Sequence, residues 1–325
     1  MGRRNRSLGA VGVALIVFVT TLGAQAPRRG LTINTIFDPV TRVDFSGTPT
    51  TNVTWLDADS YVVARRTGRA VEWLRIDAVS GRAAPLFDQS RMEAAIAALP
   101  GVTPGEAAAV AHSNTMAFNP SHTGALFSLT DDLYFYDFSV ARVSRLTSTP
   151  GGEEEATFSP DGRHVAFVRA NNMAVVNVAS QRETSLTTDG TTAILNGKLD
   201  WLYQEEIYGR GRFRGYWWSP DSSRIAFLQL DERPVPKYTI VDHIPYRPAL
   251  ETTDYPKAGD PNPLVRLGVS PIAGGPPQWV DLSSYSAVDF LIVNVDWTPS
   301  SRDVVFQLQD REQTWLDLTS ADRQT

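Results

Sequence analysis

Residues 158–168, Phe-Ser-Pro-Asp-Gly-Arg-His-Val-Ala-Phe-Val, contain the pattern that decides the fold. An aromatic residue ends one extended run, Ser-Pro-Asp-Gly forms a turn, and a run of β-branched and apolar residues follows. Pro presets φ for a turn, Asp bonds its own backbone, and Gly tolerates positive φ. The stretch therefore predicts two short strands joined by a tight turn.

The same pattern recurs along the chain. Residues 218–228 are the nearest copy, weaker copies begin at Phe118 and Trp297, and residues 55–63 open the first unit. The turn prolines at positions 120 and 160 lie 40 residues apart (160 − 120 = 40), close to the length of one four-stranded propeller blade. The later intervals, 60 and 79 residues (220 − 160 and 299 − 220), predict insertions, which in repeat arrays usually lie on one face.

These repeats predict an all-β fold, namely a β-propeller with about five blade-like units in this chain and short helical insertions. Two segments break the β pattern. Residues 90–112 are rich in Ala and Glu and predict two short helices around Pro100-Gly101, whose expected purpose is core packing. Residues 196–216 form the second interruption.

Composition narrows the classes of function. A net charge of −6 with no basic block beyond the first residues argues against nucleic acid as a partner. The absence of cysteine excludes disulfides and thiolate metal sites, and the four histidines lack metal-like spacing. We therefore expect no metal and no cofactor.

Residues 1–26 have the features of a signal peptide. Three arginines within the first six residues precede an apolar run over residues 8–22, and Ala24-Gln25-Ala26 fits a small-x-small cleavage pattern. We expect export, with a periplasmic or secreted location. The alternative is an uncleaved anchor, the one case in which we expect the chain to contact a membrane.

The second interruption contains two adjacent acids, Glu205 and Glu206, in a helix-compatible, aromatic-rich run. On an ordinary helix neighbouring side chains point about 100° apart, whereas on a short, irregular helical tip both carboxylates can reach one cation. A peptide's α-ammonium, with three hydrogen-bond donors, is such a cation. The competing interpretation is a solvated helix face, with the nearby Tyr203, Tyr208, Tyr216 and Trp217 belonging to the core rather than to a ligand cage.

Three ordered motifs carry a resemblance to a known family. Residues 200–206, Asp-Trp-Leu-Tyr-Gln-Glu-Glu, resemble the D-W-x-Y-x-E-E segment of the dipeptidyl peptidase IV family. Tyr-Trp-Trp-Ser-Pro-Asp follows at residues 216–221, then Val235-Pro236. Residues 255–263 resemble the family's Y-P-K-A-G-x-x-N-P, so that the resemblance covers roughly residues 155–270.

The resemblance implies an eight-bladed propeller that caps an α/β-hydrolase domain containing a Ser-Asp-His triad. It implies that Glu205 and Glu206 anchor the free N-terminus of a peptide substrate, and that the full-length enzyme releases N-terminal Xaa-Pro or Xaa-Ala dipeptides. It also suggests a homodimer of the full-length form.

The chain departs from that pattern in what it lacks. It contains no G-x-S-x-G nucleophile motif and no His after His243, so we assign no catalytic residue. We expect residues 27–325 to form a partial propeller, about five blades of the family's eight, from a longer serine peptidase whose hydrolase domain is absent here. The family's carbonyl-binding Arg has no counterpart in residues 125–130 and stays unassigned.

Two other functions stay open at this point. One is a non-catalytic propeller that binds partners or acts as a scaffold in the cell envelope, because a fold alone does not give a function. The other is a related endopeptidase that does not use the acidic pair.

Overall fold

The computed structural model describes residues 30–40, 42–43, 53–67 and 70–322. The chain divides into two compact units, residues 1–51 and 52–325. The first unit contains the short helix α1 (Ile33–Phe37), which a capping box between Thr32 and Thr35 begins. The predicted signal peptide over residues 1–26 lies outside the described residues.

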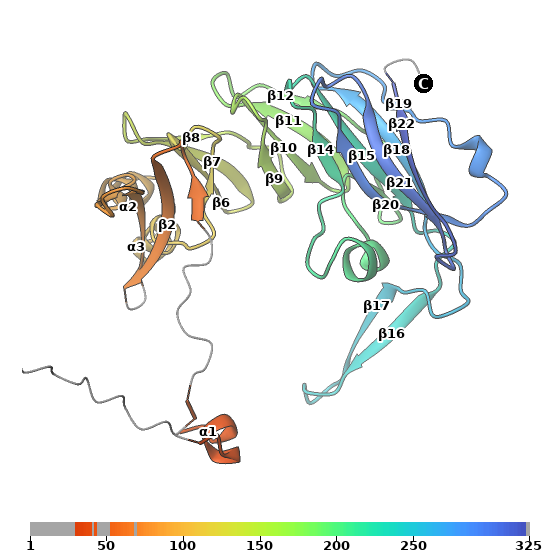
Figure 1. Cartoon of the computed structure of the whole chain (residues 1–325), viewed down its shortest axis with the longest axis horizontal. Helices are drawn as coiled ribbons and strands as arrows, with labels where there is room; N and C mark the ends of the chain where they lie inside the picture. The colour runs from red at the N-terminus through yellow and green to blue at the C-terminus, as the bar shows by residue number, and fades with distance from the viewer. Residues whose placement is uncertain (1–29, 41, 44–52, 68–69, 323–325) are drawn as a thin grey trace, which may run out of the picture. The chain divides into compact units, whose positions relative to one another are not determined.

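Three four-stranded antiparallel sheets open the second unit (Figure 1). The first contains β1 (Val53–Trp55), β2 (Ser60–Thr67), β3 (Ala70–Asp77) and β4 (Ala83–Pro85). The second contains β5 (Ala117–Phe118), β6 (Gly124–Leu129), β7 (Asp132–Asp137) and β8 (Arg142–Arg145). The third contains β9 (Glu154–Phe158), β10 (His164–Arg169), β11 (Asn172–Asn177) and β12 (Glu183–Ser185). In each sheet every strand pairs with the next one along the chain, as in a propeller blade.

Two further sheets follow with less regular composition. The fourth has the order β13 (Ile194–Asn196), β15 (Arg224–Asp231), β18 (Leu264–Pro271) and β19 (Gln278–Trp279), and β14 (Tyr216–Trp218) also pairs with β15. The fifth contains β20 (Phe290–Trp297), β21 (Val304–Asp310) and β22 (Leu316–Ala321). A separate hairpin joins β16 (Lys237–Asp242) to β17 (Ala249–Asp254), and a 3₁₀ turn covers Ser283–Tyr285. The strands of these five sheets pair antiparallel, and they confirm the predicted all-β class with few helices.

The predicted turn motif forms as the residue types require. In the third sheet Ser159 Oγ donates to Asp161 Oδ1 at 2.6 Å and accepts from His164 N at 3.0 Å, and Ser219 and Asp221 repeat this geometry in the fourth sheet. The residue after Asp161 is Gly162, with φ of 71°, and its equivalent in the fourth sheet is Ser222, with φ of 62°.

Hydrogen bonds between turns link successive sheets. Asp161 N donates to Ser222 Oγ at 3.0 Å, and Asp221 N donates to Ser301 Oγ at 2.9 Å. Each link satisfies a backbone amide of one sheet with a nearly buried hydroxyl of the next.

Both faces of the third and fourth sheets are buried, which explains why their inner strands are almost continuously apolar. Along β10, Val165 and Phe167 pack toward the second sheet, whereas Ala166 and Val168 pack toward the fourth. A third cluster joins the fourth sheet to the fifth through Leu228 and other side chains. The core is therefore a series of interfaces between successive sheets.

The predicted helices in residues 90–112 are present as α2 (Gln89–Ala97) and α3 (Pro104–Ala111) between the first and second sheets. Asp88 and Thr103 cap them, and Met92, Ile96, Ala107 and Ala111 are buried in one cluster with Tyr136. Core packing is thus their observed role. Within the described part of the chain, no helix is long and apolar enough to cross a membrane.

Candidate functional site

The acidic pair lies on an insertion in the fourth sheet. β13 and β14 pair with successive stretches of the same strand, β15, so the insertion divides one edge strand into two halves. At the division, Gly197 N donates to Leu228 O at 2.9 Å and Leu228 N donates to Gly215 O at 2.8 Å. Residues 197–215 therefore leave and rejoin the sheet at one point. This fixes the base of the segment that contains Glu205 and Glu206, which we call the acidic turn.

The turn itself is the single π-helical turn η1 (Tyr203–Ile207), the green coil beside the hairpin β16–β17 in Figure 1. Tyr208 N donates to Tyr203 O at 2.8 Å, which is the i→i+5 bond of a π-helix. A short, irregular helical tip is the arrangement that would let both carboxylates reach one cation, and η1 is such a tip.

Two tyrosines explain the wider turn. Ile292 N donates to Tyr203 Oη at 3.4 Å, and Tyr208 Oη donates to Ile292 O at 3.2 Å. Ile292 borders an irregularity in the β20–β21 pairing, where the register shifts before Asn294. Tyrosines five residues apart thus contact the backbone N–H and C=O of a single residue of the fifth sheet, and a π turn places them on the same side. Burial raises the pKa of both tyrosines, so both remain neutral.

Asp200 holds the start of the turn. Its carboxylate accepts from Tyr203 N at 3.0 Å and from Leu202 N at 3.3 Å, and the residue is only 4% exposed. Burial raises the pKa of Asp200 to about 6, although these two hydrogen bonds oppose the rise. Burial, with the charges of Asp200 and Asp254 adding to it, raises the pKa of nearby Glu232 to about 7.

The two predicted site residues differ in exposure. The Glu205 side chain is 15% exposed, and its Oε1 accepts from Arg210 Nε at 2.6 Å and from Arg210 Nη2. Glu206 is exposed and makes no hydrogen bond or ion pair to another described residue. The hydrogen bond and charge of Glu205, together with the charge of Glu206, raise the pKa of Arg210. One cation is therefore within electrostatic reach of both carboxylates.

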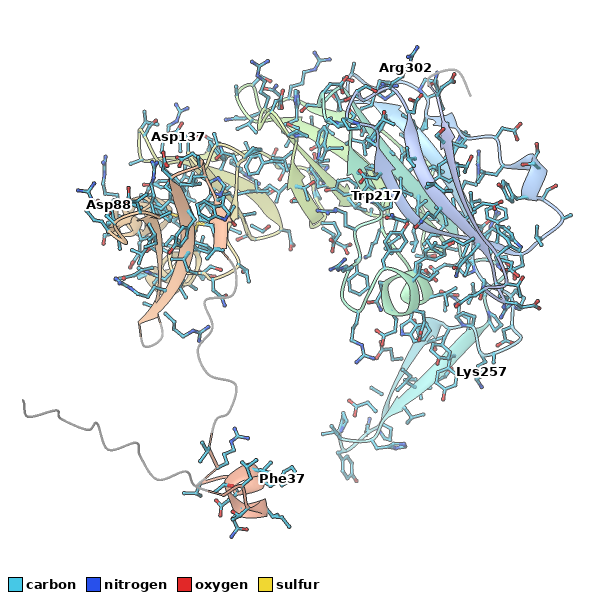
Figure 2. The ribbon with its side chains drawn as sticks, viewed as in Figure 1. Phe37, Asp88, Asp137, Trp217, Lys257 and Arg302 are labelled. Atoms are coloured by element: carbon cyan, nitrogen blue, oxygen red, sulfur yellow. The ribbon has the colours of Figure 1, made fainter. Side chains whose placement is uncertain are left out.

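The surrounding aromatic residues belong to the core, as the competing sequence interpretation predicts. Tyr203 and Tyr216 are 0% and 1% exposed. Tyr208 and Trp217 are half-buried against the cluster between the fourth and fifth sheets, and Figure 2 labels Trp217. The resembling motifs also meet in space, because the rings of Trp201 and Tyr255 lie 4.3 Å apart.

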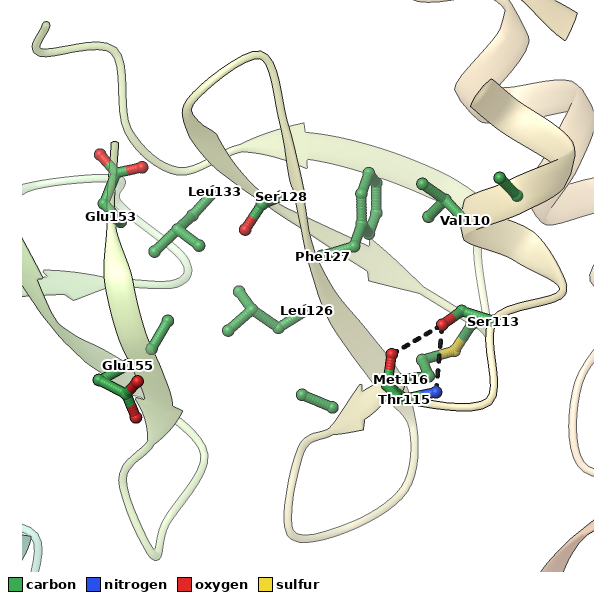
Figure 3. A pocket seen from close by; sticks show the side chains of 13 residues that line it. Val110, Ser113, Thr115, Met116, Leu126, Phe127, Ser128, Leu133, Glu153 and Glu155 are labelled. Atoms are coloured by element: carbon green, nitrogen blue, oxygen red, sulfur yellow. Dashed lines mark hydrogen bonds between the residues drawn. The ribbon is translucent and has the colours of Figure 1, made fainter. Parts of the chain in front are cut away.

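A cavity of about 450 Å³ lies elsewhere, between β6 and β9 (Figure 3). Glu153 and Glu155 line it together with apolar side chains such as Leu126 and Phe127. Its acidic residue Glu153 already has a nearly buried counter-ion, Arg169, whose Nη2 lies 2.5 Å from Glu153 Oε1. We therefore place the candidate site at the acidic turn. No group of three potential metal ligands occurs in the described ranges.

Sequence reasoning missed three parts of this site. It assigned no role to Asp200, gave the two tyrosines a place in the core but no hydrogen bond, and did not single out Arg210. The one available signal was Gly209-Arg210-Gly211, in which two glycines beside a cation indicate a tight turn directly after the acids.

Comparison with known proteins relates the whole arrangement to one family. The family model described as "Dipeptidyl peptidase IV (DPP IV) N-terminal region" matches residues 120–325. A probable dipeptidyl peptidase 4 of Aspergillus clavatus is 33% identical over 187 residues, covering 55% of this chain and 24% of that protein. The dipeptidyl peptidase 4 of Trichophyton equinum is 31% identical over 196 residues, covering 55% of this chain and 25% of that protein. These matches span about a quarter of the length of the curated relatives.

Solved structures agree with this relationship. The dipeptidyl peptidase 4 of Porphyromonas gingivalis superposes with a TM-score of 0.67 at 26% identity, covering 83% of this chain and 38% of that one. A putative dipeptidyl aminopeptidase IV of Bacteroides ovatus gives a TM-score of 0.64 at 19% identity, covering 86% of this chain and 36% of that one. The second likeness concerns the fold alone.

Proposed function

Because the chain belongs to the dipeptidyl peptidase IV N-terminal region family, we propose that it is the substrate-recognition propeller of an exported serine exopeptidase. In this proposal Glu205 and Glu206 bind the free α-ammonium of a peptide, and the full-length enzyme releases an N-terminal Xaa-Pro or Xaa-Ala dipeptide. Residues 1–26 direct export to the periplasm or the medium, and the full-length enzyme forms a homodimer.

The observation that carries the proposal is the cation already held at the turn. Arg210 donates to Glu205 and is under the electrostatic influence of Glu206 as well. A turn that binds a guanidinium through one carboxylate, with a second carboxylate close enough to act on it by charge, has the charge and the acceptors to hold an ammonium. Two opposite unit charges roughly 4 Å apart attract by about 1 kcal/mol in water and about 4 kcal/mol at an effective dielectric constant of about 20. Because the Glu205 side chain is only 15% exposed, its attraction for an ammonium should lie toward the larger of these two values.

The rigid support of the turn makes such binding selective for the end of a peptide. Asp200 caps the start of η1, and Tyr203 and Tyr208 fix η1 against the fifth sheet. A binding group on a fixed support measures substrate length from the point it holds, because its position does not adapt to the ligand. The acidic pair thus recognises an N-terminal amine and sets the distance from it to the cleaved bond.

Peptide binding by the full chain tests the proposal. Titration calorimetry with Ala-Pro-Ala and with its N-acetylated form isolates the contribution of the positive charge. We expect the free peptide to bind more tightly, and Glu205→Gln and Glu206→Gln each to lose roughly tenfold or more of that affinity, because each removes a charge-assisted hydrogen bond.

Glu251→Gln is the matched control. Glu251 is exposed on β17 and loses the same charge at a position outside the acidic turn, so its peptide binding is expected to stay at the wild-type value. Equal affinity of the wild-type chain for the free and acetylated peptides would refute the proposal and favour a scaffold role instead.

A further inference from the structure

Arg210 occupies a backbone position that the structure fixes on both sides. It lies between Gly209, with φ of 104°, and Gly211, with φ of 81°, a region that favours glycine. Arg212 N donates to Gly209 O at 3.0 Å, which closes the turn, and Gly211 N donates to the side chain of Gln204 at 2.8 Å. Since Gln204 belongs to η1 and is only 6% exposed, the acidic turn itself holds Arg210 next to Glu205.

The contact between Arg210 and Glu205 is unequal. Arg210 uses Nε and Nη2, yet both bond to one oxygen of Glu205, Oε1. The Arg210 side chain is 85% exposed, whereas that of Glu205 is 15% exposed. No direct bond joins Arg210 to Glu206, whose effect on it is through charge alone. An exposed guanidinium that uses one acceptor of the pair is held weakly.

We propose that Arg210 is a specificity-determining residue that occupies the cation position of the acidic pair in the empty site and must be displaced by an incoming α-ammonium. The inference rests on the proposed function of Glu205 and Glu206. The ligand class is a primary ammonium at the end of a peptide.

The chemistry of the two cations supports displacement. An ammonium is a compact charge with three donors that can be shared between two carboxylates, whereas the planar guanidinium of Arg210 directs its donors along fixed lines. An ammonium that bonds both acids therefore gains more binding free energy than Arg210 gains from Glu205 alone. A neutral N-acetyl group has no charge with which to compete, so Arg210 excludes blocked peptides more strongly than an unoccupied acidic pair would.

Arginine variants of the full chain test the proposal through the sign of the change in affinity. The measurement is calorimetric titration of Ala-Pro-Ala and of its N-acetylated form. We expect Arg210→Ala to bind the free peptide roughly two- to fivefold more tightly than wild type, because an exposed ion pair changes an equilibrium only by a small factor. Arg210→Lys, which keeps a charge but loses the planar fork, is expected to lie between the two.

Arg212→Ala is the matched control. Arg212 is an exposed arginine two residues further on that makes no ion pair among the described residues, so this variant changes net charge equally but leaves the contact on Glu205 in place. The gain of Arg210→Ala over Arg212→Ala isolates the contact from the general effect of charge. If Arg210→Ala binds the free peptide no better than Arg212→Ala, or more weakly than wild type, the competition model is wrong; weaker binding would make Arg210 a substrate ligand.

A double variant separates the failure of this inference from the failure of the proposed function. In a Glu205→Gln background the competition model expects Arg210→Ala to have no further effect, because the two residues act through one contact. A gain that persists in that background would overturn the model while leaving the role of the acids intact. If wild type binds the free and the N-acetylated peptide equally well, the proposed function itself is refuted. Circular dichroism spectra that superpose for all variants establish that they share one fold.

Discussion

The third and fourth sheets begin from the same sequence pattern and reach different results. Both contain a Ser-Pro-Asp turn between two strands, and both bury a phenylalanine eight residues after the turn serine, Phe167 in β10 and Phe227 in β15. The third sheet consists of four strands and their turns. The fourth divides its edge strand to carry η1 and extends the hairpin β16–β17. The repeat supplies the interfaces between sheets, and the insertion supplies the candidate chemistry.

The largest expected effect tests whether the two sheets share one kind of core. Phe167→Ala and Phe227→Ala should each lower the free energy of unfolding by about 3–5 kcal/mol, because each removes a fully buried ring and leaves a cavity. Urea unfolding followed by tryptophan fluorescence measures both. The two values should agree to within about 1 kcal/mol if the insertion leaves the core of the fourth sheet unchanged.

Val140→Ala is the control for these two variants, because Val140 is 60% exposed and its truncation should change stability little. A small loss for Phe227→Ala beside a large one for Phe167→Ala would contradict the shared core. It would indicate that the fourth sheet depends on its insertion for stability.

The next largest effect is a dependence of stability on pH that arises from the buried acids of the fourth sheet and its insertion. Burial raises the pKa of Asp200 to about 6 and that of Glu232 to about 7, above their ordinary values of 3.8 and 4.5. Between those values the native state binds more protons than the unfolded state, so the free energy of unfolding falls as pH rises. Relative to wild type, Asp200→Asn should gain about 1–3 kcal/mol as the pH rises from 4 to 7, because it removes the buried charge and keeps an acceptor for the cap.

Urea unfolding at a series of pH values measures this difference. Several exposed acids, among them Asp57, Glu106 and Asp281, have lowered pKa values and act in the opposite direction. The difference from wild type is therefore the informative quantity, and Glu251→Gln is the control at an exposed position. Parallel curves for wild type and Asp200→Asn across this pH range would show that burial does not govern the charge of Asp200.

The same contrast explains how much the sequence could predict. Ser159, Pro160 and Asp161 specify their turn through their own side chains and backbone, so a local pattern suffices to predict the strands of the regular sheets. The π turn depends instead on Ile292, 89 residues from Tyr203, and no local pattern contains that partner. Glu205 and Glu206 were identified as candidates because their motif is recognisable, whereas Arg210 required the geometry of its turn. Likewise, burial rather than sequence spacing distinguishes Asp200 from an exposed acid.

The smallest expected effect concerns the links that the two kinds of sheet share. Ser222→Ala removes the acceptor of Asp161 N, and Ser301→Ala removes the acceptor of Asp221 N. Each should lower the free energy of unfolding by about 1 kcal/mol, because a backbone amide loses its partner at a nearly buried position.

Ser222→Gly should cost less than Ser222→Ala, since the φ of 62° at this position favours glycine although the hydrogen bond is lost in both variants. Urea unfolding of the three variants gives the comparison. Equal losses for Ser222→Ala and Ser301→Ala would mean that the insertion in the fourth sheet leaves the contacts between neighbouring turns unaltered. A loss confined to Ser222→Ala would mean that the link from the fourth sheet to the fifth is carried elsewhere, and Tyr203 and Tyr208, which join the acidic turn to Ile292, are the side chains placed to carry it.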